Sequence, residues 1–300
     1  MVGRCRPHSE GPELSRLVWG AFRLLDGPRP AGASEIVRLV ETCLDLGITT
    51  IDHADIYGGY RVEAAFGEAL AARPDLRSRI ELVTKCGIGL LAGERPDHRV
   101  KHYDSSAAHI RASVERSLRN LHAETIDVLL LHRPDPLLDA DEAAGELEAL
   151  VRDGLVRAVG VSNYTPTQLA LLRDRLTTPL VTNQLEISLV RPGALEDGSL
   201  DEAQRLRMHP MAWGPLGGGR LFDDDTPLGR ALRETAEAYA LPGPAAAALA
   251  WVMRLPSAPL PVVGTTRAER LPDLAAAASV RLETQDWFAL YEAARGRAVA

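Results

Sequence analysis

Four side chains that can donate, accept or hold a proton stand at or just beyond the ends of strand-like segments in the first half of the chain. They are Asp52, Tyr57, Lys85 and His132. A free phenol has a pKa near 10, and a neighbouring ammonium group lowers it. A carboxylate paired with the lysine would keep that ammonium charged, while an imidazole could hold a carbonyl oxygen from the other side. We therefore expect a site that protonates an oxygen as negative charge develops on it, as carbonyl reduction requires.

The segments that must position these residues alternate between strand and helix patterns. The spacing predicts strands at 17–20, 48–52, 79–85, 126–132, 156–162, 180–186, 208–213 and 260–263. It predicts helices at 34–46, 60–72, 105–122, 141–152, 166–175, 199–206, 227–240, 244–254, 267–278 and 283–295. The run 126–132 is apolar throughout, which is typical of a parallel strand covered on both faces. Strands that alternate with helices pair in parallel through right-handed crossovers.

Eight such repeats predict an α/β fold in which the strands close into a (β/α)8 TIM barrel, with an open doubly wound sheet as the alternative. No shift in composition marks a second domain, so residues 1–300 are interpreted as one domain. Residues 1–14 would form an N-terminal extension or hairpin, and 280–300 a C-terminal helix or tail. In such a barrel the carboxyl ends of the strands share one rim. That rim would bring Asp52, Lys85 and His132 together, with Tyr57 in the loop beside them.

Composition excludes several other classes of protein. The 300 residues carry a net charge of −7, which leaves no basic footprint for nucleic acid. No apolar run approaches the ~20 residues of a membrane helix, and the N-terminus lacks the apolar core of a secretory signal. The three cysteines Cys5, Cys43 and Cys86 are widely spaced, which favours a reducing cytoplasm over a disulfide framework.

A metal site is a weaker interpretation of the same region. His53, Asp55 and His132 suggest a metal-dependent barrel hydrolase, but neighbouring strand residues point to opposite faces, so Asp52 and His53 would not share the barrel mouth. His98 and His102 have helical spacing within a segment rich in Pro, Arg and Asp, where a solvated loop is the expected structure. The thiol that follows Lys85 should be buried and inert. We expect no metal.

Several short motifs occur in an order that resembles a known family. They are Gly47, Thr49, Ile51, Asp52, Ala54, Asp55, Tyr57 and Gly58, then Thr84 and Lys85, Leu131 to Pro134, Gly160 to Asn163, Asn183 and Gln184, and Pro215 to Gly217. Over residues 15 to 280 the chain resembles the aldo-keto reductases. The run from Ala212 to Leu221 is most similar to the short bacterial members of that family. The resemblance implies a TIM barrel, NADPH as hydride donor, and a tetrad in which Tyr57 is the general acid.

The resemblance also implies which residues bind the cofactor. Ser162, Asn163 and Gln184 would hydrogen-bond the nicotinamide carboxamide. Trp213, where the family usually has tyrosine, would stack on the nicotinamide ring, although a core position is the simpler alternative. A glycine-rich loop would lie along the pyrophosphate, where backbone can approach closely. The loop residues concerned are Gly214, Leu216, Gly217 and Gly218.

The adenosine 2′-phosphate is expected at the turn after the last strand. Thr265 and Arg270 match the family's phosphate-binding positions, and an arginine fork suits a phosphate group. Two residues depart from the pattern: Gly264 replaces a common lysine, and Leu274 replaces a polar adenine contact. NADPH is preferred over NADH on this basis. Arg267 is interpreted as a solvated charge at the start of a helix.

The substrate would be a small carbonyl compound whose identity the sequence does not specify. We expect the long loop at 86–104 to form one wall of the pocket, and the short tail after Val280 to leave that pocket open and permissive. The chain is expected to act as a monomer. The remaining alternative is a non-catalytic member that binds the cofactor and signals to another protein.

Overall fold

Eight parallel strands close into a barrel in the computed structural model, which describes residues 1–26, 30–223 and 225–300. The barrel strands are β3 (Val18–Gly20), β4 (Thr50–Asp52), β5 (Glu81–Cys86), β8 (Ile126–Leu131), β9 (Val156–Ser162), β10 (Leu180–Glu186), β11 (Met211–Trp213) and β12 (Leu260–Val263). The last strand, β12, pairs with the first, β3, so the sheet has no free edge. The predicted (β/α)8 barrel is confirmed, and the open-sheet alternative is wrong.

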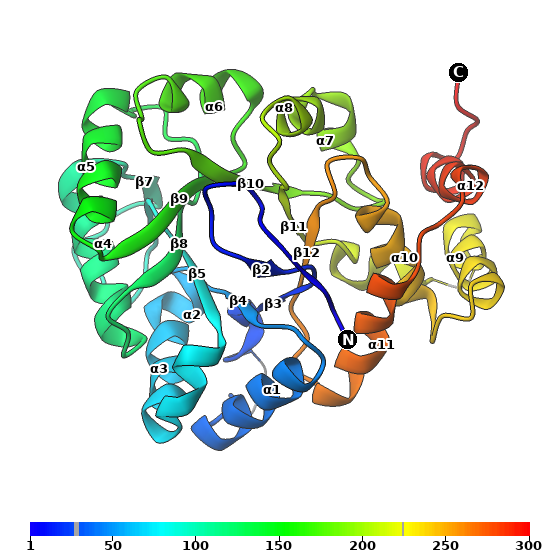
Figure 1. Ribbon diagram of the computed structural model, residues 1–300, viewed down its shortest axis with the longest axis horizontal. Helices are drawn as coiled ribbons and strands as arrows, with labels where there is room; N and C mark the ends of the chain where they lie inside the picture. The colour runs from blue at the N-terminus through cyan, green and yellow to red at the C-terminus, as the bar shows by residue number, and fades with distance from the viewer. Residues whose placement is uncertain (27–29, 224) are drawn as a thin grey trace.

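Helices surround the barrel on its outside (Figure 1). They are α1 (Ala33–Asp45), α2 (Tyr57–Tyr60), α3 (Val62–Ala72), α4 (Ala107–Asn120), α5 (Ala140–Arg152), α6 (Pro166–Arg173), α7 (Gly193–Glu196), α8 (Ser199–Arg205), α9 (Pro227–Ala238), α10 (Pro244–Met253), α11 (Leu271–Ala275) and α12 (Thr284–Arg295). Helices α9 and α12 pack against each other on one side of the ring, beyond α10.

Helix boundaries follow from capping residues in the sequence. The Ser106 side chain accepts a hydrogen bond from the first turn of α4, and Asp139 does the same for α5. Thr165 and Gln168 form a reciprocal capping box at the start of α6. Gly47 follows α1 in a left-handed conformation with φ +81°, which ends that helix before β4. These caps fix where each helix begins or ends relative to the strand it follows or precedes.

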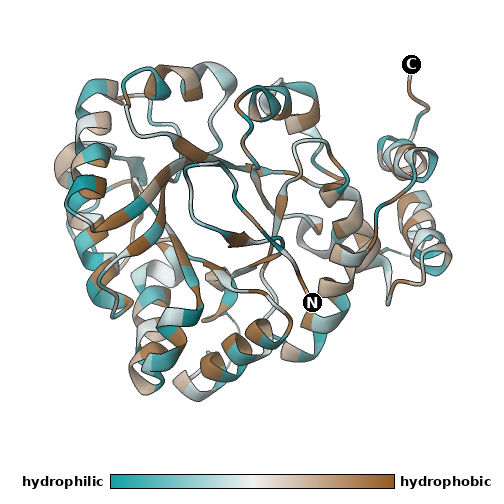
Figure 2. Cartoon of the chain, viewed as in Figure 1, coloured by the Kyte–Doolittle hydropathy of each residue, from teal (hydrophilic) through white to brown (hydrophobic). Residues whose placement is uncertain are grey.

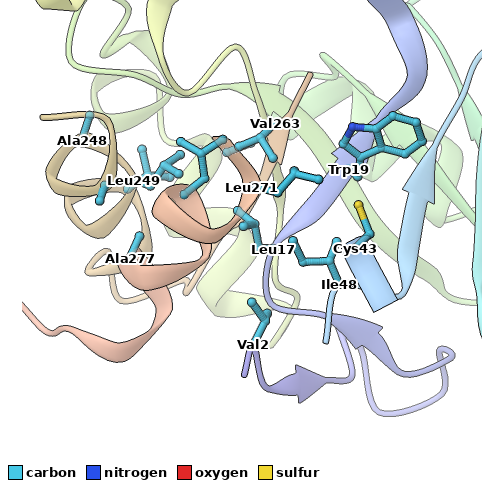
Figure 3. Close-up of a cluster of buried hydrophobic side chains, with 14 of the residues drawn as sticks. Val2, Leu17, Trp19, Cys43, Ile48, Ala248, Leu249, Val263, Leu271 and Ala277 are labelled. Carbon is cyan, nitrogen blue, oxygen red and sulfur yellow. The ribbon is translucent and has the colours of Figure 1, made fainter. Parts of the chain in front are cut away.

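The apolar core has two parts, one inside the barrel and one between strands and helices. Inside lie apolar side chains from most strands, including Val83, Val128, Leu130 and Met211. The outer layers hold two larger clusters, and Figure 3 shows part of one, where β3 meets α10 and α11. Figure 2 shows the complementary surface, with hydrophilic residues on the outward sides of the helices. Burial on both faces explains why the strands are apolar without alternation.

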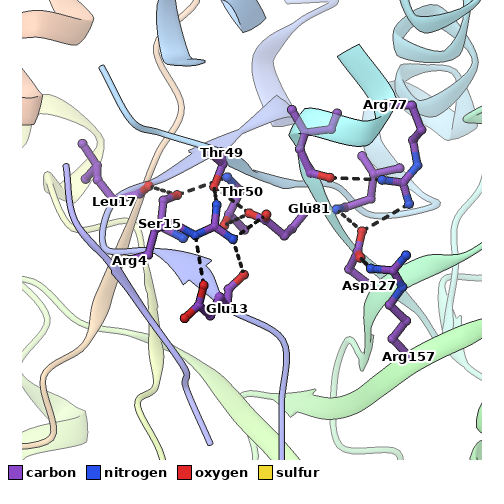
Figure 4. Close-up of polar contacts among 12 residues, drawn as sticks. Arg4, Glu13, Ser15, Leu17, Thr49, Thr50, Arg77, Glu81, Asp127 and Arg157 are labelled. Carbon is purple, nitrogen blue, oxygen red and sulfur yellow. Dashed lines mark hydrogen bonds and ion pairs between the residues drawn. The ribbon is translucent and has the colours of Figure 1, made fainter. Parts of the chain in front are cut away.

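A hairpin covers the end of the barrel where the strands begin. Strands β1 (Arg4–Cys5) and β2 (Leu14–Ser15) pair antiparallel and cross the barrel in Figure 1. The Arg4 guanidinium donates to the Thr49 hydroxyl at 2.7 Å and to Glu81 at 2.8 Å (Figure 4). These bonds tie the hairpin to the starts of β4 and β5. Access to the barrel interior is therefore restricted to the opposite end.

Asp127 forms a separate buried charge cluster near the same end. Its carboxylate accepts hydrogen bonds from the Leu82 N–H at 2.9 Å and from Arg77 at 3.2 Å, and pairs with Arg157 at 2.9 Å (Figure 4). A buried carboxylate with three good partners is compensated for its lost hydration. Asp127 thus links β8 to β5 and β9 at a position remote from the carboxyl ends of the strands.

The observed elements differ from the predicted ones at several places. The strand at 79–85 extends to Cys86, and the strand predicted at 208–213 begins only at Met211. The helix predicted at 267–278 is broken into 3₁₀ segments at 268–270 and 276–279 flanking α11, because Pro272 restarts a helix in its first turn. The 86–104 segment is more ordered than a solvated loop, since β6 (Ile88–Gly89) pairs with β7 (His102–Tyr103).

None of the described helices is long and apolar enough to cross a membrane.

Candidate active site

Lys85 lies at the centre of the group that the sequence singled out. Its Nζ donates to both carboxylate oxygens of Asp52, at 2.8 and 2.7 Å, and to the backbone oxygen of His53 at 2.7 Å. It also lies 3.1 Å from the Tyr57 hydroxyl. The ammonium group is fully buried, so each of these contacts replaces hydration that it lost on folding. Three of the four predicted residues are therefore in direct contact.

Strand pairing explains how these residues meet. Asp52 is the last residue of β4 and pairs in register with Val83 on β5, two residues before Lys85. Residues two apart on a strand share a face, so Asp52 and Lys85 both point into the barrel. His53 points the other way and packs its ring edge-on against Phe66 at 4.5 Å. The turn after β4 then brings Tyr57 back over the barrel mouth.

The pKa of Tyr57 differs from the sequence-based expectation. Burial raises it above the ordinary value of a phenol, and the opposing effect of Lys85 is not large enough to reverse that shift. The expected lowering is therefore wrong in direction, because the sequence did not show how deeply the hydroxyl is buried. For Lys85, burial alone would lower the pKa, but attraction to Asp52 and Tyr57 outweighs it and raises the pKa. Near neutral pH the pair is a neutral phenol beside an ammonium ion.

His132 completes the predicted group from β8. Its ring centroid lies 6.1 Å from that of Tyr57, in an edge-to-face arrangement. Burial, followed by repulsion from Lys85, holds the pKa of His132 well below its usual range, so the imidazole is neutral. Its buried Nδ1 has no partner, which leaves Nε2 as the ring nitrogen that reaches the cavity. A neutral imidazole there can hydrogen-bond a carbonyl oxygen without adding charge.

A cavity of about 1200 Å³ extends from these residues along the carboxyl ends of the strands. Apart from Lys85, which lies beneath its floor, every predicted site residue lines this cavity. These residues are Asp52, Tyr57, His132, Ser162, Asn163, Gln184, Trp213, Gly214, Leu216, Gly217, Gly218, Thr265 and Arg270. The structure therefore brings the predicted proton-transfer and cofactor residues to one continuous trough.

The amide and hydroxyl groups beside Tyr57 already bond to one another. Asn163 donates to the Ser162 hydroxyl at 2.7 Å and accepts from the Trp213 indole N–H at 2.9 Å. Ser162 donates to the Gln184 backbone oxygen, and the Gln184 amide nitrogen donates to Asp52 at 2.8 Å. The Gln184 side-chain oxygen takes part in none of these bonds. Gln184 lines the cavity, so among the described residues this oxygen is an acceptor available to a ligand there.

The glycine-rich loop forms a cradle along the trough. Gly214, Gly217, Gly218 and Gly219 all have positive φ values, between 56° and 91°, which residues with a Cβ rarely adopt. A Cβ added to Gly218 or Gly219 would meet nothing within 4 Å, so this backbone faces open space. Such a loop lets a large group approach the main chain closely.

Positive charge gathers at the far end of the trough. Arg267 and Arg270 both line it, and neither has an ion-pair partner among the described residues. Thr265 lies between them and β12, and its backbone oxygen accepts a hydrogen bond from the buried Trp19 indole at 2.8 Å. The interpretation of Arg267 as a merely solvated charge is incomplete, because its side chain belongs to the trough. Gly264 and Leu274 line the same end.

Several residues of the cavity were not identified as site residues from the sequence, and four of them are Phe22, Arg23, Arg133 and Glu186. The Phe22 ring packs edge-on against the Tyr57 ring, with 5.0 Å between the two ring centroids. The Arg133 guanidinium lies 5.6 Å from the Trp213 ring centroid. The signal was available, since all four lie at or just past the carboxyl end of a predicted strand. The 86–104 loop, in contrast, contributes no described residue to the cavity wall, so that expectation is wrong.

The alternative metal site is not assembled. Among the described residues, no group of three or more His, Cys, Asp or Glu side chains is arranged to hold a metal ion. His53 packs on Phe66, and burial followed by repulsion from Lys85 lowers its pKa to about 3. Asp55 faces Arg116 on α4. The proposed ligands thus point to different neighbours.

A second group of buried charges lies behind β4 and β5. Neither carboxylate oxygen of Asp55 accepts a hydrogen bond with good geometry, and its nearest cation, Arg116, is 3.9 Å away. Glu63 on α3 is also buried and accepts a 2.6 Å hydrogen bond from Thr84. Burial, followed by repulsion from Glu63, raises the pKa of Asp55 to about 8. The carboxyl groups of Asp55 and Glu63 are therefore both buried near a single guanidinium group, that of Arg116, between the strands and the outer helices.

Comparison with known proteins defines the class to which this barrel and site belong. The model of the aldo/keto reductase family matches residues 16–295. The chain belongs to the aldo/keto reductase family, and it is an NAD(P)H-dependent oxidoreductase. The resemblance noted in the sequence is confirmed.

Individual relatives make the placement more specific. The chain is 49% identical over 298 residues to the protein named oxidoreductase YdhF of Escherichia coli (strain K12), covering 99% of each chain. It is 46% identical over 292 residues to the 6-dehydroglucose reductase of Agrobacterium fabrum, covering 97% of this chain and 98% of that one. Among solved structures, it superposes on the glycerol dehydrogenase AKR11B4 from Gluconobacter oxydans with a TM-score of 0.83 and 27% identity. That match covers 97% of this chain and 94% of the other.

The residues present fit a nicotinamide dinucleotide. The trough has an acceptor oxygen at one end, an open glycine cradle in the middle and, at the other end, two guanidinium groups without an ion-pair partner in the part of the chain that the structure describes. This order matches the amide, pyrophosphate and phosphate groups of such a cofactor. The trough's volume of about 1200 Å³ also suits a ligand larger than most small substrates.

Proposed function

We propose that the protein reduces aldehydes or ketones to alcohols with NADPH and that Tyr57 donates the proton. The observation that carries this proposal is the 3.1 Å contact between the Tyr57 hydroxyl and Lys85 Nζ at the floor of the trough. The bound cofactor would supply hydride to the carbonyl carbon. The side chains would bind the carbonyl oxygen, orient it and protonate it as it gains charge.

Each side chain has a separate part in this scheme. Tyr57 is neutral near pH 7, so it holds the proton that the oxygen needs. Lys85, kept charged by Asp52, stabilises the phenolate left after that proton moves. His132 would donate from Nε2 to the same carbonyl oxygen and fix its direction. The neutral imidazole suits this role because it adds no further charge beside Lys85.

The expected carbonyl compounds are small and polyhydroxylated. Two relatives, at 46% and 41% identity, are named 6-dehydroglucose reductase, which is a sugar aldehyde reductase by name. The cavity beside Tyr57 combines the aromatic rings of Phe22 and Trp213 with the charged groups of Arg133 and Glu186. Aromatic faces with nearby hydrogen-bonding groups are suited to sugars. We therefore propose 6-dehydroglucose as the first substrate to assay.

The test has two stages that separate binding from turnover. NADPH and NADH are first titrated against the protein by fluorescence, and we expect the tighter binding for NADPH. The better cofactor is then assayed by its absorbance with 6-dehydroglucose, glyceraldehyde and 4-nitrobenzaldehyde. Tight NADPH binding with no turnover on this panel would instead favour the non-catalytic alternative. The absence of NADPH binding would refute the proposal outright.

Replacing Arg270 with alanine tests the cofactor preference. A charge-assisted hydrogen bond contributes about 1.5–3 kcal/mol, so we expect the Kd for NADPH to rise by roughly 10- to 100-fold. The Kd for NADH should change less than about twofold, because NADH lacks the 2′-phosphate. Fluorescence titration of both cofactors measures the difference. Arg267→Ala is the matched comparison on the same turn, and equal losses for NADH and NADPH in Arg270→Ala would contradict the assignment.

A further inference from the structure

The turn that presents Tyr57 has a strained backbone. Gly58, Gly59 and Tyr60 adopt φ values of 57°, 67° and 71° in succession. Glycine takes this left-handed conformation at little cost, but a residue with a bulky side chain does so only where its surroundings impose it. The strain falls on Tyr60. Contacts outside the turn must therefore hold Tyr60 in place.

Those contacts come from the loop at 86–104. The Tyr60 hydroxyl accepts a hydrogen bond from the Leu90 N–H at 2.8 Å and donates to the Ile88 backbone oxygen at 3.4 Å. The Arg95 guanidinium lies 4.5 Å from the centre of the Tyr60 ring, a cation–π distance. The side chain is only 7% exposed. One hydroxyl group thus joins the turn to the main chain of the loop.

The hydrogen bonds of the Tyr60 hydroxyl lie close in the chain to the proton-transfer pair, Tyr57 and Lys85. Tyr60 lies three residues after Tyr57, and Ile88 lies three residues after Lys85. The Tyr57–Lys85 contact is made by residues of two separate chain segments. The Tyr60–Ile88 bond joins the same two segments immediately beyond it. A tie at this place limits how far Tyr57 can move away from Lys85.

The 86–104 loop is held in one conformation by contacts of its own. Strands β6 and β7 pair at its two ends, and a His98 ring nitrogen lies 2.9 Å from the Leu90 backbone oxygen. Arg61, at the end of the turn, lies 3.7 Å from Glu94 of the loop. These contacts give the loop a role that pocket lining does not explain, since none of its described residues reaches the cavity.

We propose that Tyr60 is a positioning residue, which holds Tyr57 at hydrogen-bond distance from Lys85 by tying its turn to the 86–104 loop. This rests on the proposed role of Tyr57 as proton donor. Without the tie, the turn relaxes and the phenol spends less time aligned with the carbonyl oxygen. Cofactor binding does not change, because Tyr60 is not among the trough residues.

The test is Tyr60→Phe, which removes the hydroxyl and keeps the ring under Arg95. We expect kcat for 4-nitrobenzaldehyde to fall by roughly 5- to 50-fold, while KM and the Kd for NADPH stay within about twofold. The solvent deuterium isotope effect on kcat should increase, because proton transfer from a misaligned phenol becomes slower. A general loss of stability would not produce that isotope effect.

Tyr291→Phe is the matched control. Tyr291 on α12 is also 7% exposed, has Arg295 over its ring at 5.1 Å, and its hydroxyl donates to Glu196 at 3.2 Å. It should leave kcat unchanged. If Tyr60→Phe does not fold, Arg95→Ala is measured in the same way and is expected to lower kcat alone.

Two results would overturn the proposal. The first is an unchanged kcat in Tyr60→Phe, and the second is a loss matched by Tyr291→Phe. Full activity in Tyr57→Phe would instead refute the proposed function. A fully active Tyr60→Phe beside a Tyr57→Phe that has lost most of its turnover would refute the positioning role alone.

Discussion

Tyr57→Phe is expected to reduce turnover by a factor of about 10² to 10⁴, the usual contribution of a general acid. The substitution removes one oxygen and keeps the ring, which packs against Phe22. NADPH affinity should stay within about twofold, because the glycine cradle and Arg270 are unchanged. Steady-state rates with the best carbonyl substrate, together with cofactor titration by fluorescence, measure the two quantities.

The stability of the same variant provides its control. Removing the phenol also removes one of the contacts of Lys85, which keeps three others to Asp52 and His53. We therefore expect a thermal midpoint close to that of the wild type. A Tyr57→Phe protein with full activity would refute the role of Tyr57. A protein that no longer binds NADPH would show that the change had disturbed the trough.

Asp55→Asn is expected to stabilise the protein, and to do so more strongly as the pH rises. In the unfolded chain this carboxyl has its ordinary pKa near 3.9, whereas burial raises it to about 8 in the folded protein. Between these values the folded state holds a proton that the unfolded state has released. Wild-type stability therefore decreases from about pH 4 to pH 8, by up to about 1.4 kcal/mol per pH unit. Asparagine removes this dependence and keeps the shape of the side chain.

Denaturant unfolding at pH 5, 6, 7 and 8 measures this difference. Asp127→Asn is the matched control, because it neutralises another buried carboxylate far from the site. Asp127 has three good partners, so its neutralisation leaves the half-buried Arg77 without its carboxylate partner and should destabilise the protein. An Asp55→Asn protein that is less stable than wild type at pH 8 would show that the carboxylate is better compensated than its geometry indicates.

The fold was predictable from sequence because eight short strand-like segments, most of them apolar and rich in β-branched residues, each precede a helical pattern. Strand ends were sufficient to identify Asp52, Lys85 and His132, since the register of parallel strands brings their carboxyl ends to one rim. Phe22 and Arg23 follow the same rule after β3 and were overlooked because neither carries out proton transfer. The resemblance to a family, rather than any physical pattern, pointed to the trough residues after β9.

Other features depend on contacts between segments far apart in the chain. The direction of the Tyr57 pKa shift depends on how deeply its hydroxyl is buried, which no local pattern indicates. The 86–104 loop was expected to line the pocket, but its length says nothing about which neighbour it contacts. Tyr60 appeared to be the first residue of an ordinary helix. Its left-handed backbone could not be predicted, because it depends on hydrogen bonds to the 86–104 loop.

The pairing of β3 with β12 affects how the protein is made on the ribosome. The first barrel strand ends at Gly20, and its second neighbour is not translated until Val263. Throughout that interval the nascent chain carries an unpaired strand edge, which is the kind of edge that leads to aggregation. Asp52 and Lys85 are synthesised early, yet the trough has no opposite wall until the sheet closes. The barrel edge is therefore exposed for most of synthesis, and the chain can hold no cofactor until β12 has closed it.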